Sequence, residues 1–197
     1  MSPQTIIFFG RSGSGKGTQA RLLEEYLRKN DSSKRGVIYI ETGARFRQFM
    51  NEKGYTNKLT KDVLDQGGLL PEFLPIWLWS GIFIKEYTGK EHLILDGLSR
   101  RVAEAPVLSA ALKFYKREKP CVIVLNVSRK WSMDRLKERG RYDDAEKEIN
   151  RRLDWYDANV APTIEYFKKD AYYKYLEIDG EQPVEKVHED IIGNLQL

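Results

Sequence analysis

A glycine-rich segment lying directly between a strand and a helix is the feature that most limits how this chain can fold. Gly10–Thr18 reads GRSGSGKGT, follows the apolar run Thr5–Phe9 and overlaps the start of a helical pattern over Gly17–Asn30. In that setting Gly13 and Gly15 let backbone N–H groups approach a phosphate, and the helix N-terminus adds a favourable dipole. The segment therefore predicts a phosphate-binding loop.

The side chains of this loop add a charge and a hydroxyl. Lys16 reaches the β- and γ-phosphates as a point charge, and Thr18 offers its hydroxyl toward phosphate or Mg²⁺. An ordinary glycine-rich turn with an incidental lysine is the alternative, but the spacing and the context favour the phosphate site. We expect a nucleoside triphosphate to contact Gly13, Ser14, Gly15, Lys16, Gly17 and Thr18.

Short apolar runs alternate with helical patterns along the chain. Runs nearly continuous in Ile, Val, Leu and aromatic residues predict strands buried on both faces, at Thr5–Phe9, Val37–Ile40, His92–Leu95, Cys121–Val127 and Tyr175–Ile178. Helices are predicted at Gly17–Asn30, Val102–Lys116, Arg129–Arg139, Ala145–Asp170 and Pro183–Leu195. The order predicts an α/β fold of the P-loop NTPase type, a five-stranded parallel sheet with helices on both faces, in one domain over residues 1–197.

Residues 41–91 interrupt this rhythm. About fifty residues separate the second and third strands, which is more than one crossover helix needs. Three short helical patterns lie in the segment, at Ala44–Lys53, Lys58–Gln66 and Glu72–Lys85. We interpret the segment as an inserted helical subdomain.

The composition narrows the function classes. The single cysteine, Cys121, excludes an internal disulfide and a cysteine-rich zinc site, and it favours a reducing cytoplasm. His92 and His188 have no ligand-like spacing and are interpreted as structural or surface residues. The apolar stretch Leu69–Ile84 is too short and interrupted to span a membrane. Because 33 basic and 29 acidic residues are interspersed, we expect no nucleic acid partner, and we expect a monomer.

One detail of the phosphate loop points to a family. Gly17 follows Lys16, where P-loops usually carry Ser or Thr, and GKGTQ resembles the phosphate loop of adenylate kinases and related nucleoside monophosphate kinases. The resemblance extends over nearly the whole chain. It implies transfer of the γ-phosphoryl group of ATP, with Mg²⁺, to a nucleoside monophosphate, and the acceptor that best fits the pattern is AMP (ATP + AMP = 2 ADP).

The segment Glu41–Arg47 (ETGARFR) looks like the start of the monophosphate-binding subdomain of this family. By that match, Thr42 and Gly43 line the nucleotide pocket and Arg47 binds the α-phosphate of the acceptor, a role that suits the planar guanidinium group. Arg45 is a close competitor for the role. A solvated helix arginine is the simpler alternative.

Two further segments resemble base-binding parts of the family. Gln66–Glu72 (QGGLLPE) looks like the stretch that holds the adenine of the monophosphate, with Leu70 and Gly68 closest. The base of the donor is expected near Asp179–Gly180, with Gly180 in contact.

The segment Leu93–Arg100 (LILDGLSR) ends a predicted buried strand, where parallel sheets place ligand-contacting residues. By the resemblance, Asp96 holds the hydration shell of Mg²⁺, Gly97 permits close approach of the acceptor and Arg100 binds its phosphate. Ser99 stands where the family usually has proline, so the turn before Arg100 is expected to be built differently.

Arginines in Arg135–Leu153 match the lid of the short-lid members of the family. By that match Arg135 faces the donor, and Arg139, Arg141 and Arg152 surround the transferred phosphoryl group. A charged helical face is the alternative reading of such a segment. The lid, residues 139–144, is predicted to be one tight turn, and the lone cysteine rules out a zinc-binding lid.

These matches give the site expected for phosphoryl transfer, in which a phosphate oxygen attacks and no general base is needed. The catalytic set is Lys16, Arg100, Arg139, Arg141 and Arg152. The monophosphate site is Thr42, Gly43, Arg47, Gly68, Leu70, Gly97, Arg100, Glu104, Arg141 and Arg152.

Because of Glu104, the sequence does not decide which base the acceptor carries. It stands four residues after Arg100, where adenylate kinases have a glutamine that reads adenine. A carboxylate only accepts hydrogen bonds and suits guanine, uracil or thymine, which present a ring N–H. Glu104 is otherwise a solvated helix residue, or a partner that binds adenine through one bond and water. GMP, UMP, CMP or dTMP are the alternative acceptors, and a small-molecule P-loop kinase and a non-catalytic nucleotide-binding protein are the alternative classes.

Overall fold

Five parallel strands form the centre of the molecule. The computed structural model describes residues 2–140 and 144–197. The strands are β1 (Thr5–Gly10), β2 (Val37–Glu41), β3 (His92–Asp96), β4 (Cys121–Asn126) and β5 (Lys174–Asp179), in the order β2-β3-β1-β4-β5. Each predicted strand is confirmed to within one residue at either end, and the predicted α/β fold is confirmed with it.

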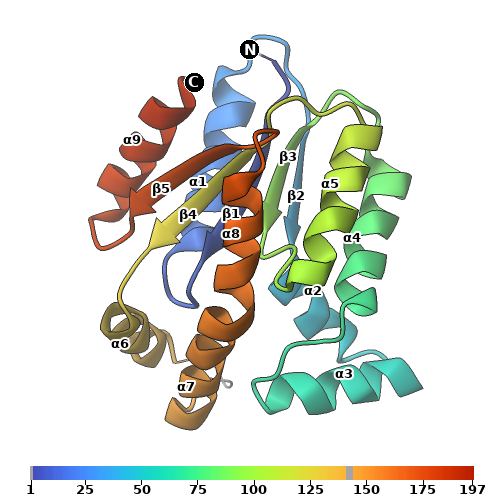
Figure 1. Ribbon diagram of the computed structural model, residues 1–197, viewed down its shortest axis with the longest axis vertical. Coiled ribbons are helices and arrows are strands. Elements are labelled where there is room, and N and C mark those ends of the chain that lie inside the picture. Colours follow the sequence, from blue (N-terminus) through green and yellow to red (C-terminus); the bar gives the residue numbers. More distant parts are fainter. Residues whose placement is uncertain (1, 141–143) are drawn as a thin grey trace.

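Helices cover both faces of this sheet (Figure 1). They are α1 (Lys16–Asn30), α2 (Thr42–Phe49), α3 (Tyr55–Asp65), α4 (Phe73–Glu86), α5 (Ala105–Phe114), α6 (Arg129–Arg139), α7 (Glu146–Trp155), α8 (Ala161–Lys169) and α9 (Val184–Leu195). Successive side chains of a strand point to opposite faces, so Ile6 and Phe8 pack against α1 and α9. Ile7 and Phe9 pack against α4, α5 and α8 on the other face.

The three helices between β2 and β3 divide between two cores. Trp79 and Phe83 of α4 are buried in the same cluster as Ile7 and Phe9 of the sheet. Phe46, Leu70 and Leu74 form a separate small cluster, with Val63 and Leu64 of α3 packed against it. The last helix of the 41–91 segment is thus anchored on the sheet, and α2 and α3 extend beyond it (Figure 1).

The predicted helix over Ala145–Asp170 is not one uninterrupted α-helix. The chain passes from α7 through a π turn, Tyr156–Val160, into α8, and the N–H of Ala161 donates to the carbonyl of Tyr156. Pro162 supplies a physical reason, because proline has no N–H to continue the regular i→i−4 ladder. Similarly, the helix predicted from Val102 begins with a 3-10 turn, Val102–Glu104, before α5.

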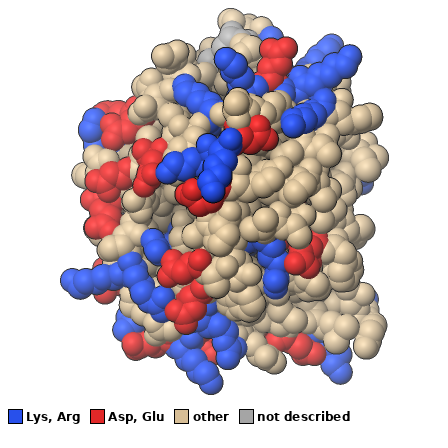
Figure 2. Space-filling model, viewed as in Figure 1, with Lys and Arg blue, Asp and Glu red and all other residues tan. Residues whose placement is uncertain are grey.

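Among the described residues, no helix is both long enough and apolar enough to cross a membrane. Figure 2 shows basic and acidic side chains interspersed over the viewed face rather than separated into broad regions of one sign.

The carboxyl ends of the strands meet at one edge of the sheet. Glu41 at the end of β2 pairs in register with Asp96 at the end of β3, and Asp96 pairs with Phe8 of β1. The glycine-rich loop leaves β1 at this same edge. Side chains from sequence segments far apart are therefore brought together here by the register of the sheet.

Arg117 supports the opposite edge and yields a stability prediction. The residue is 6% exposed, and its guanidinium donates to Thr5 Oγ1 at 2.6 Å, to the carbonyl of Gln4 at 2.6 Å and to Tyr87 Oη at 2.9 Å. We expect Arg117→Ala to lower the free energy of unfolding by about 2–4 kcal/mol, because it leaves buried acceptors without a donor. Urea unfolding measures the change.

Arg28→Ala, which removes an exposed pair with Glu24, is the control and should cost less than about 1 kcal/mol. Equal losses in both variants would contradict the prediction.

Candidate active site

A cavity of about 510 Å³ opens at the carboxyl edge of the sheet. Its wall comes from the glycine-rich loop, the loops after β2 and β3, the segment between α3 and α4, and the helices α6 and α7. Every described residue predicted above as a site residue lines it: Gly13, Ser14, Gly15, Lys16, Gly17, Thr18, Thr42, Gly43, Arg47, Gly68, Leu70, Asp96, Gly97, Arg100, Glu104, Arg135, Arg139, Arg152 and Gly180. Arg141 lies outside the described residues.

The glycine-rich loop is fixed between the sheet and α6. Gly13 has a φ of +84°, a conformation that disfavours other residues. A Cβ on Gly13 would lie 2.9 Å from the carbonyl oxygen of Ser132 and 3.1 Å from Leu136 Cγ, both on α6. The loop therefore needs glycine here both for its turn and for its packing, and α6 holds it in place.

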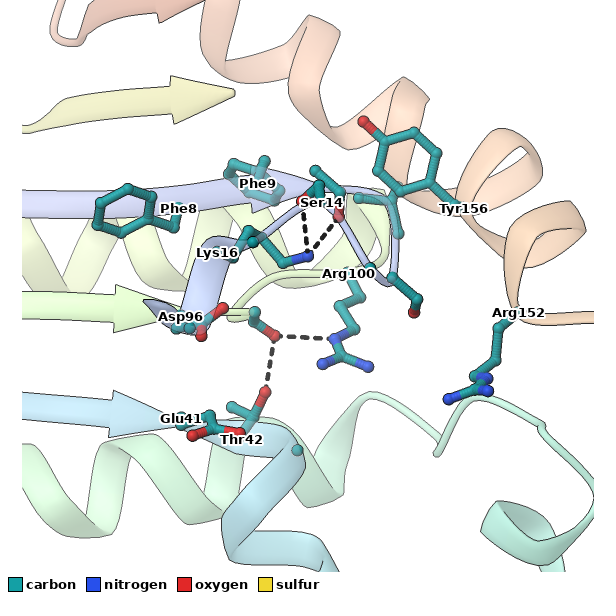
Figure 3. A pocket seen from close by; sticks show the side chains of 18 of the residues that line it. Phe8, Phe9, Ser14, Lys16, Glu41, Thr42, Asp96, Arg100, Arg152 and Tyr156 are labelled. Carbon is teal, nitrogen blue, oxygen red and sulfur yellow. Dashed lines mark hydrogen bonds between the residues drawn. The ribbon is translucent and has the colours of Figure 1, made fainter. Parts of the chain in front are cut away.

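Lys16, the first residue of α1, turns back over this loop (Figure 3). Its ammonium donates to the carbonyl oxygens of Gly10 at 2.7 Å and Arg11 at 2.8 Å. Burial lowers the pKa of Lys16 to about 8, Asp96 acts in the opposite direction, and Arg100 and Arg139 add to the lowering. Negative groups nearby thus stabilise the protonated, charged form of Lys16.

Asp96 is the nearest buried acid. It is 6% exposed, and burial raises its pKa while Lys16 counteracts that effect. Tyr39 Oη donates to Asp96 Oδ2 at 3.3 Å, and burial together with the charge of Asp96 raises the pKa of Tyr39. Tyr39 could not be predicted as a site residue, since nothing in a strand pattern marks which side chain will reach an acid on the neighbouring strand. Its hydroxyl fixes the direction of the Asp96 carboxylate.

Oxygen donors suited to Mg²⁺ are present at this end of the cavity. Asp96 supplies a carboxylate and Thr18 a hydroxyl, and both line the cavity beside Lys16. Among residues 2–140 and 144–197 no group of three or more His, Cys, Asp or Glu side chains is placed to hold a metal. This donor set fits a Mg²⁺ ion that keeps most of its waters and its phosphate ligands, which is how Mg²⁺ usually binds beside a nucleotide.

The turn after β3 is built around the carbonyl of Gly97. Arg100 Nε donates to this oxygen at 3.0 Å and Thr42 Oγ1 donates to it at 2.8 Å, as Figure 3 shows. Gly97 has a φ of +74°, and a Cβ there would lie 2.8 Å from Arg100 Nη2. The guanidinium of Arg100 therefore lies directly against the glycine and is oriented by it.

Ser99 has a backbone conformation in this turn that proline cannot adopt. The residue is fully buried and has a φ of +54°, whereas the ring of proline holds φ near −65°. Proline is incompatible with the turn as it stands in this chain. A left-handed conformation at a residue with a side chain costs roughly 1–2 kcal/mol, which the packing of the turn must offset.

Arg47 and Arg45 are placed on different surfaces. Arg47 lines the main cavity, and a Cβ on Gly43 would lie 3.3 Å from Arg47 Nη1 and 3.7 Å from Arg100 Nη2. Both guanidinium groups thus lie beside Gly43. Arg47 Nη2 also forms an ion pair with Glu41 Oε1 at 3.2 Å. Arg45 instead lines a shallower groove between α2 and α4.

The lid arginines share one acid. Arg139 Nη2 lies 2.7 Å from Asp144 Oδ1, and Arg152 Nη2 lies 2.6 Å from the same oxygen. The Asp144 side chain is 1% exposed, so it binds the two arginines away from solvent. The sequence analysis assigned no role to Asp144. Arg135, which also lines the cavity, stacks over the ring of Trp131 at 4.9 Å.

Glu104 is buried in the cavity wall rather than solvated. It is 2% exposed, and the alternative of a solvated helix residue is wrong. Burial raises its pKa to about 7, and the positive charge of Arg100 opposes part of that rise. Arg101, which was not predicted as a site residue, also lines the cavity and lies over the ring of Trp155 at 5.3 Å.

Comparison with known proteins identifies the family to which the chain is similar. The family model described as adenylate kinase matches residues 8–172. A protein named adenylate kinase from Bacteroides fragilis is 33% identical over 191 residues, covering 94% of this chain and 95% of the relative. Proteins named adenylate kinase 1 are 33% identical in Nostoc sp., over 96% of this chain and 97% of the relative, and 36% identical in Synechocystis sp., over 92% and 91%. The resemblance found in the sequence is confirmed.

The electrostatics of Lys16 can be measured directly. Because burial favours the neutral amine, we expect Lys16 to titrate near pH 8 in the protein without nucleotide, and at higher pH once a bound triphosphate stabilises the ammonium. NMR of ¹³C-labelled lysine follows the titration, and loss of the signal in Lys16→Arg identifies it. A midpoint in the nucleotide-free protein at the ordinary lysine value, about 10.4, would contradict the expectation.

Proposed function

This chain belongs to the adenylate kinase family, and we propose that it transfers the γ-phosphoryl group of ATP to AMP, forming two molecules of ADP. The observation that carries the proposal is the convergence of Lys16 with Arg100, Arg139 and Arg152 on one cavity that begins at a phosphate-binding loop. Cations from separate segments converging on one point suit a reaction that moves negative charge.

The donor ATP is held by the glycine-rich loop. Backbone N–H groups of Gly13–Thr18 bind the β-phosphate, and Lys16 contacts the β- and γ-phosphates. Arg135 and Arg139 lie on the donor side, and Gly180 borders the base of the donor. The stacking of Arg135 on Trp131 supports this assignment, because it keeps the guanidinium at the wall of the cavity.

The acceptor AMP occupies the other half of the cavity. Arg47 and Arg100 bind its α-phosphate, and their shared position beside Gly43 supports this pairing. Thr42, Gly43 and Gly97 line the path of the phosphate, and Gly68 and Leu70 border the base. Arg141 and Arg152 complete the set from the lid and α7.

Charge neutralisation is the main work of the protein. An oxygen of the α-phosphate of AMP attacks the γ-phosphorus, the bond to the β–γ bridging oxygen breaks, and the electron pair of that bond stays on ADP. Lys16 and the arginines stabilise the charge that builds on the bridging and equatorial oxygens, and one well-placed arginine contributes roughly 10³–10⁵ in rate. Asp96, through water, and Thr18 would hold Mg²⁺, which would add to the neutralisation of the phosphates.

Water must be kept away from the γ-phosphate, since hydrolysis competes with transfer. We assign this exclusion to closure of the helical insertion at residues 41–91 and of the short lid at residues 139–144. Extension of α2 and α3 beyond the sheet supports the first assignment, as does their small core of Phe46, Leu70 and Leu74. We also assign the enzyme to the cytoplasm, which the free buried thiol of Cys121 supports, and we propose that it acts as a monomer.

A coupled kinase assay tests the function. With ATP and Mg²⁺, kcat/KM should be highest for AMP among AMP, GMP, CMP, UMP and dTMP near neutral pH. Lys16→Met should lower it by at least about 10³-fold, because the charge on the transferred group loses its nearest cation. Arg28→Met, which alters an exposed pair on α1, serves as the matched control and should leave turnover unchanged. No ADP formation with any acceptor would overturn the proposal.

Gly97 tests whether the orientation of Arg100 matters. A Cβ at this position would collide with Arg100 Nη2, so Gly97→Ala should displace the guanidinium and lower kcat by about 10²-fold. Gly81→Ala in α4 is the matched control, because its new Cβ meets nothing within 4 Å. That variant should keep full activity and gain about 0.5–1 kcal/mol in stability. Full activity in Gly97→Ala would show that Arg100 needs no such support.

A further inference from the structure

The side chain of Arg11 leaves the phosphate loop and makes three contacts elsewhere. It donates from Nη1 to the carbonyl of Val127 at 2.9 Å and from Nη2 to Asp157 Oδ1 at 2.7 Å. The guanidinium carbon also lies 4.9 Å from the centre of the Tyr156 ring. Val127 directly follows β4, and Tyr156 and Asp157 begin the π turn after α7. Arg11 therefore joins the phosphate loop to two segments that lie 116 and 146 residues away in the sequence.

This set of contacts depends on the shape of arginine. The planar guanidinium donates from two terminal nitrogens in different directions and still offers a flat face to an aromatic ring, whereas the ammonium of lysine is a compact point charge. The side chains of Arg11 and Asp157 are 23% and 48% exposed. An ion pair as exposed as this one adds little to the stability of a fold. Orientation of neighbouring groups is therefore the better account of the three contacts.

The backbone carbonyl of Arg11 contacts the most buried cation of the site. Lys16 Nζ donates to this oxygen at 2.8 Å, and the N–H of Ser14 donates to it at 3.1 Å. The carbonyl and the guanidinium belong to one residue, so the contacts that fix the side chain of Arg11 also limit the movement of its carbonyl. The position of the Lys16 ammonium thus depends on where the Arg11 side chain is bound.

The ring beside Arg11 is connected by one helical turn to a second cation of the site. The N–H of Tyr156 donates to the carbonyl of Arg152. Residues four apart in a helix lie on the same face, and both of these side chains line the cavity. Figure 3 shows them on one continuous helical segment. A group that holds Tyr156 and Asp157 therefore also fixes the position of Arg152.

We propose that Arg11 is a positioning residue that sets the separation between Lys16 and Arg152. Its carbonyl holds the ammonium, and its guanidinium holds the helical turn that follows Arg152. The proposal rests on the function assigned above, in which both cations act on the transferred phosphoryl group. Their separation matters because a displacement of about 1 Å in a catalytic group can lower a rate by about 10²-fold.

The rate of phosphoryl transfer in a single turnover with ATP and AMP tests the proposal, because it separates the chemical step from product release. Asp157→Ala removes the carboxylate that binds Arg11, and the transfer rate should fall by about 10-fold to 10²-fold. Arg11→Met removes all three contacts and should lower the rate at least as far. The Kd of AMP should change little in either variant, since Arg47 and Arg100 still hold its phosphate.

Asp154→Ala is the matched control. Asp154 lies on the same helical segment, its side chain is 69% exposed, and it pairs with Arg129 at 2.8 Å. Asp157 also lies 3.8 Å from Arg129, so the control removes the closer acidic partner of that arginine and leaves the pair of Arg11 intact. The transfer rate of this variant should equal that of the wild type.

The NMR signal of Lys16 in ¹³C-lysine-labelled protein without nucleotide gives a second readout, which a role in stability alone would not move. It should shift in Arg11→Met and in Asp157→Ala and stay in place in Asp154→Ala, because only the first two changes release the carbonyl that binds the ammonium.

Two sets of results would overturn the proposal. One is a wild-type transfer rate or an unmoved Lys16 signal in both Arg11→Met and Asp157→Ala. The other is an equal loss of rate in Asp157→Ala and in Asp154→Ala. No transfer by the wild type to any acceptor refutes the kinase function instead, and the Lys16 signal then still decides whether Arg11 positions the ammonium.

Discussion

The ammonium of Lys16 is held by the carbonyl oxygens of Gly10 and Arg11, and its charge interacts most strongly with the buried carboxylate of Asp96. Removing these two groups from water is costly, and their mutual attraction offsets part of that cost. The parallel register of β1 and β3 sets their separation, because the loop of Lys16 leaves β1 next to the strand that ends in Asp96. The other cations of the site are arranged around this pair, and its position therefore depends on the sheet and not on surface loops.

The parts of this arrangement that could be predicted are those with a local signal. Buried parallel strands are continuous apolar runs, and glycines at fixed spacing mark the phosphate loop, so both follow from short stretches of sequence. Arg47 and Arg100 could be assigned only by family resemblance, because an isolated arginine on a helix has no distinguishing pattern. The contact of Tyr39 with Asp96 and the burial of Asp144 depend on tertiary packing, and no sequence spacing encodes them. Arg141 falls outside the described residues, and its role stays a prediction.

Ser99 illustrates how a single departure from the family pattern is absorbed. With φ of +54° at Ser99 and +74° at Gly97, the chain makes two left-handed residues within three positions. The carbonyl of Gly97 then accepts from both Thr42 and Arg100, which ties the end of β3 to the start of α2. The strain at Ser99 is consequently offset by the hydrogen bonds that hold the side chain of Arg100. Such strain is typical of functional turns, where the surroundings fix a conformation that the isolated sequence disfavours.

The same reasoning explains why acids accompany the arginines. Guanidinium groups gathered in one cavity repel one another, and burial lowers the pKa of Arg100. Glu41 pairs with Arg47, and Asp144 pairs with both Arg139 and Arg152, so these three arginines each have a negative partner within the fold. A phosphate that enters the cavity competes with these carboxylates for the same guanidinium donors. The net free energy gained on binding is therefore smaller than it would be for an arginine without an acidic partner. In exchange, the arginines are already oriented before substrate arrives, and less reorganisation is needed as charge moves in the transition state. Arg152 lies on α7, so the position of its backbone does not depend on residues 139–144, and the short lid expected there stays a prediction.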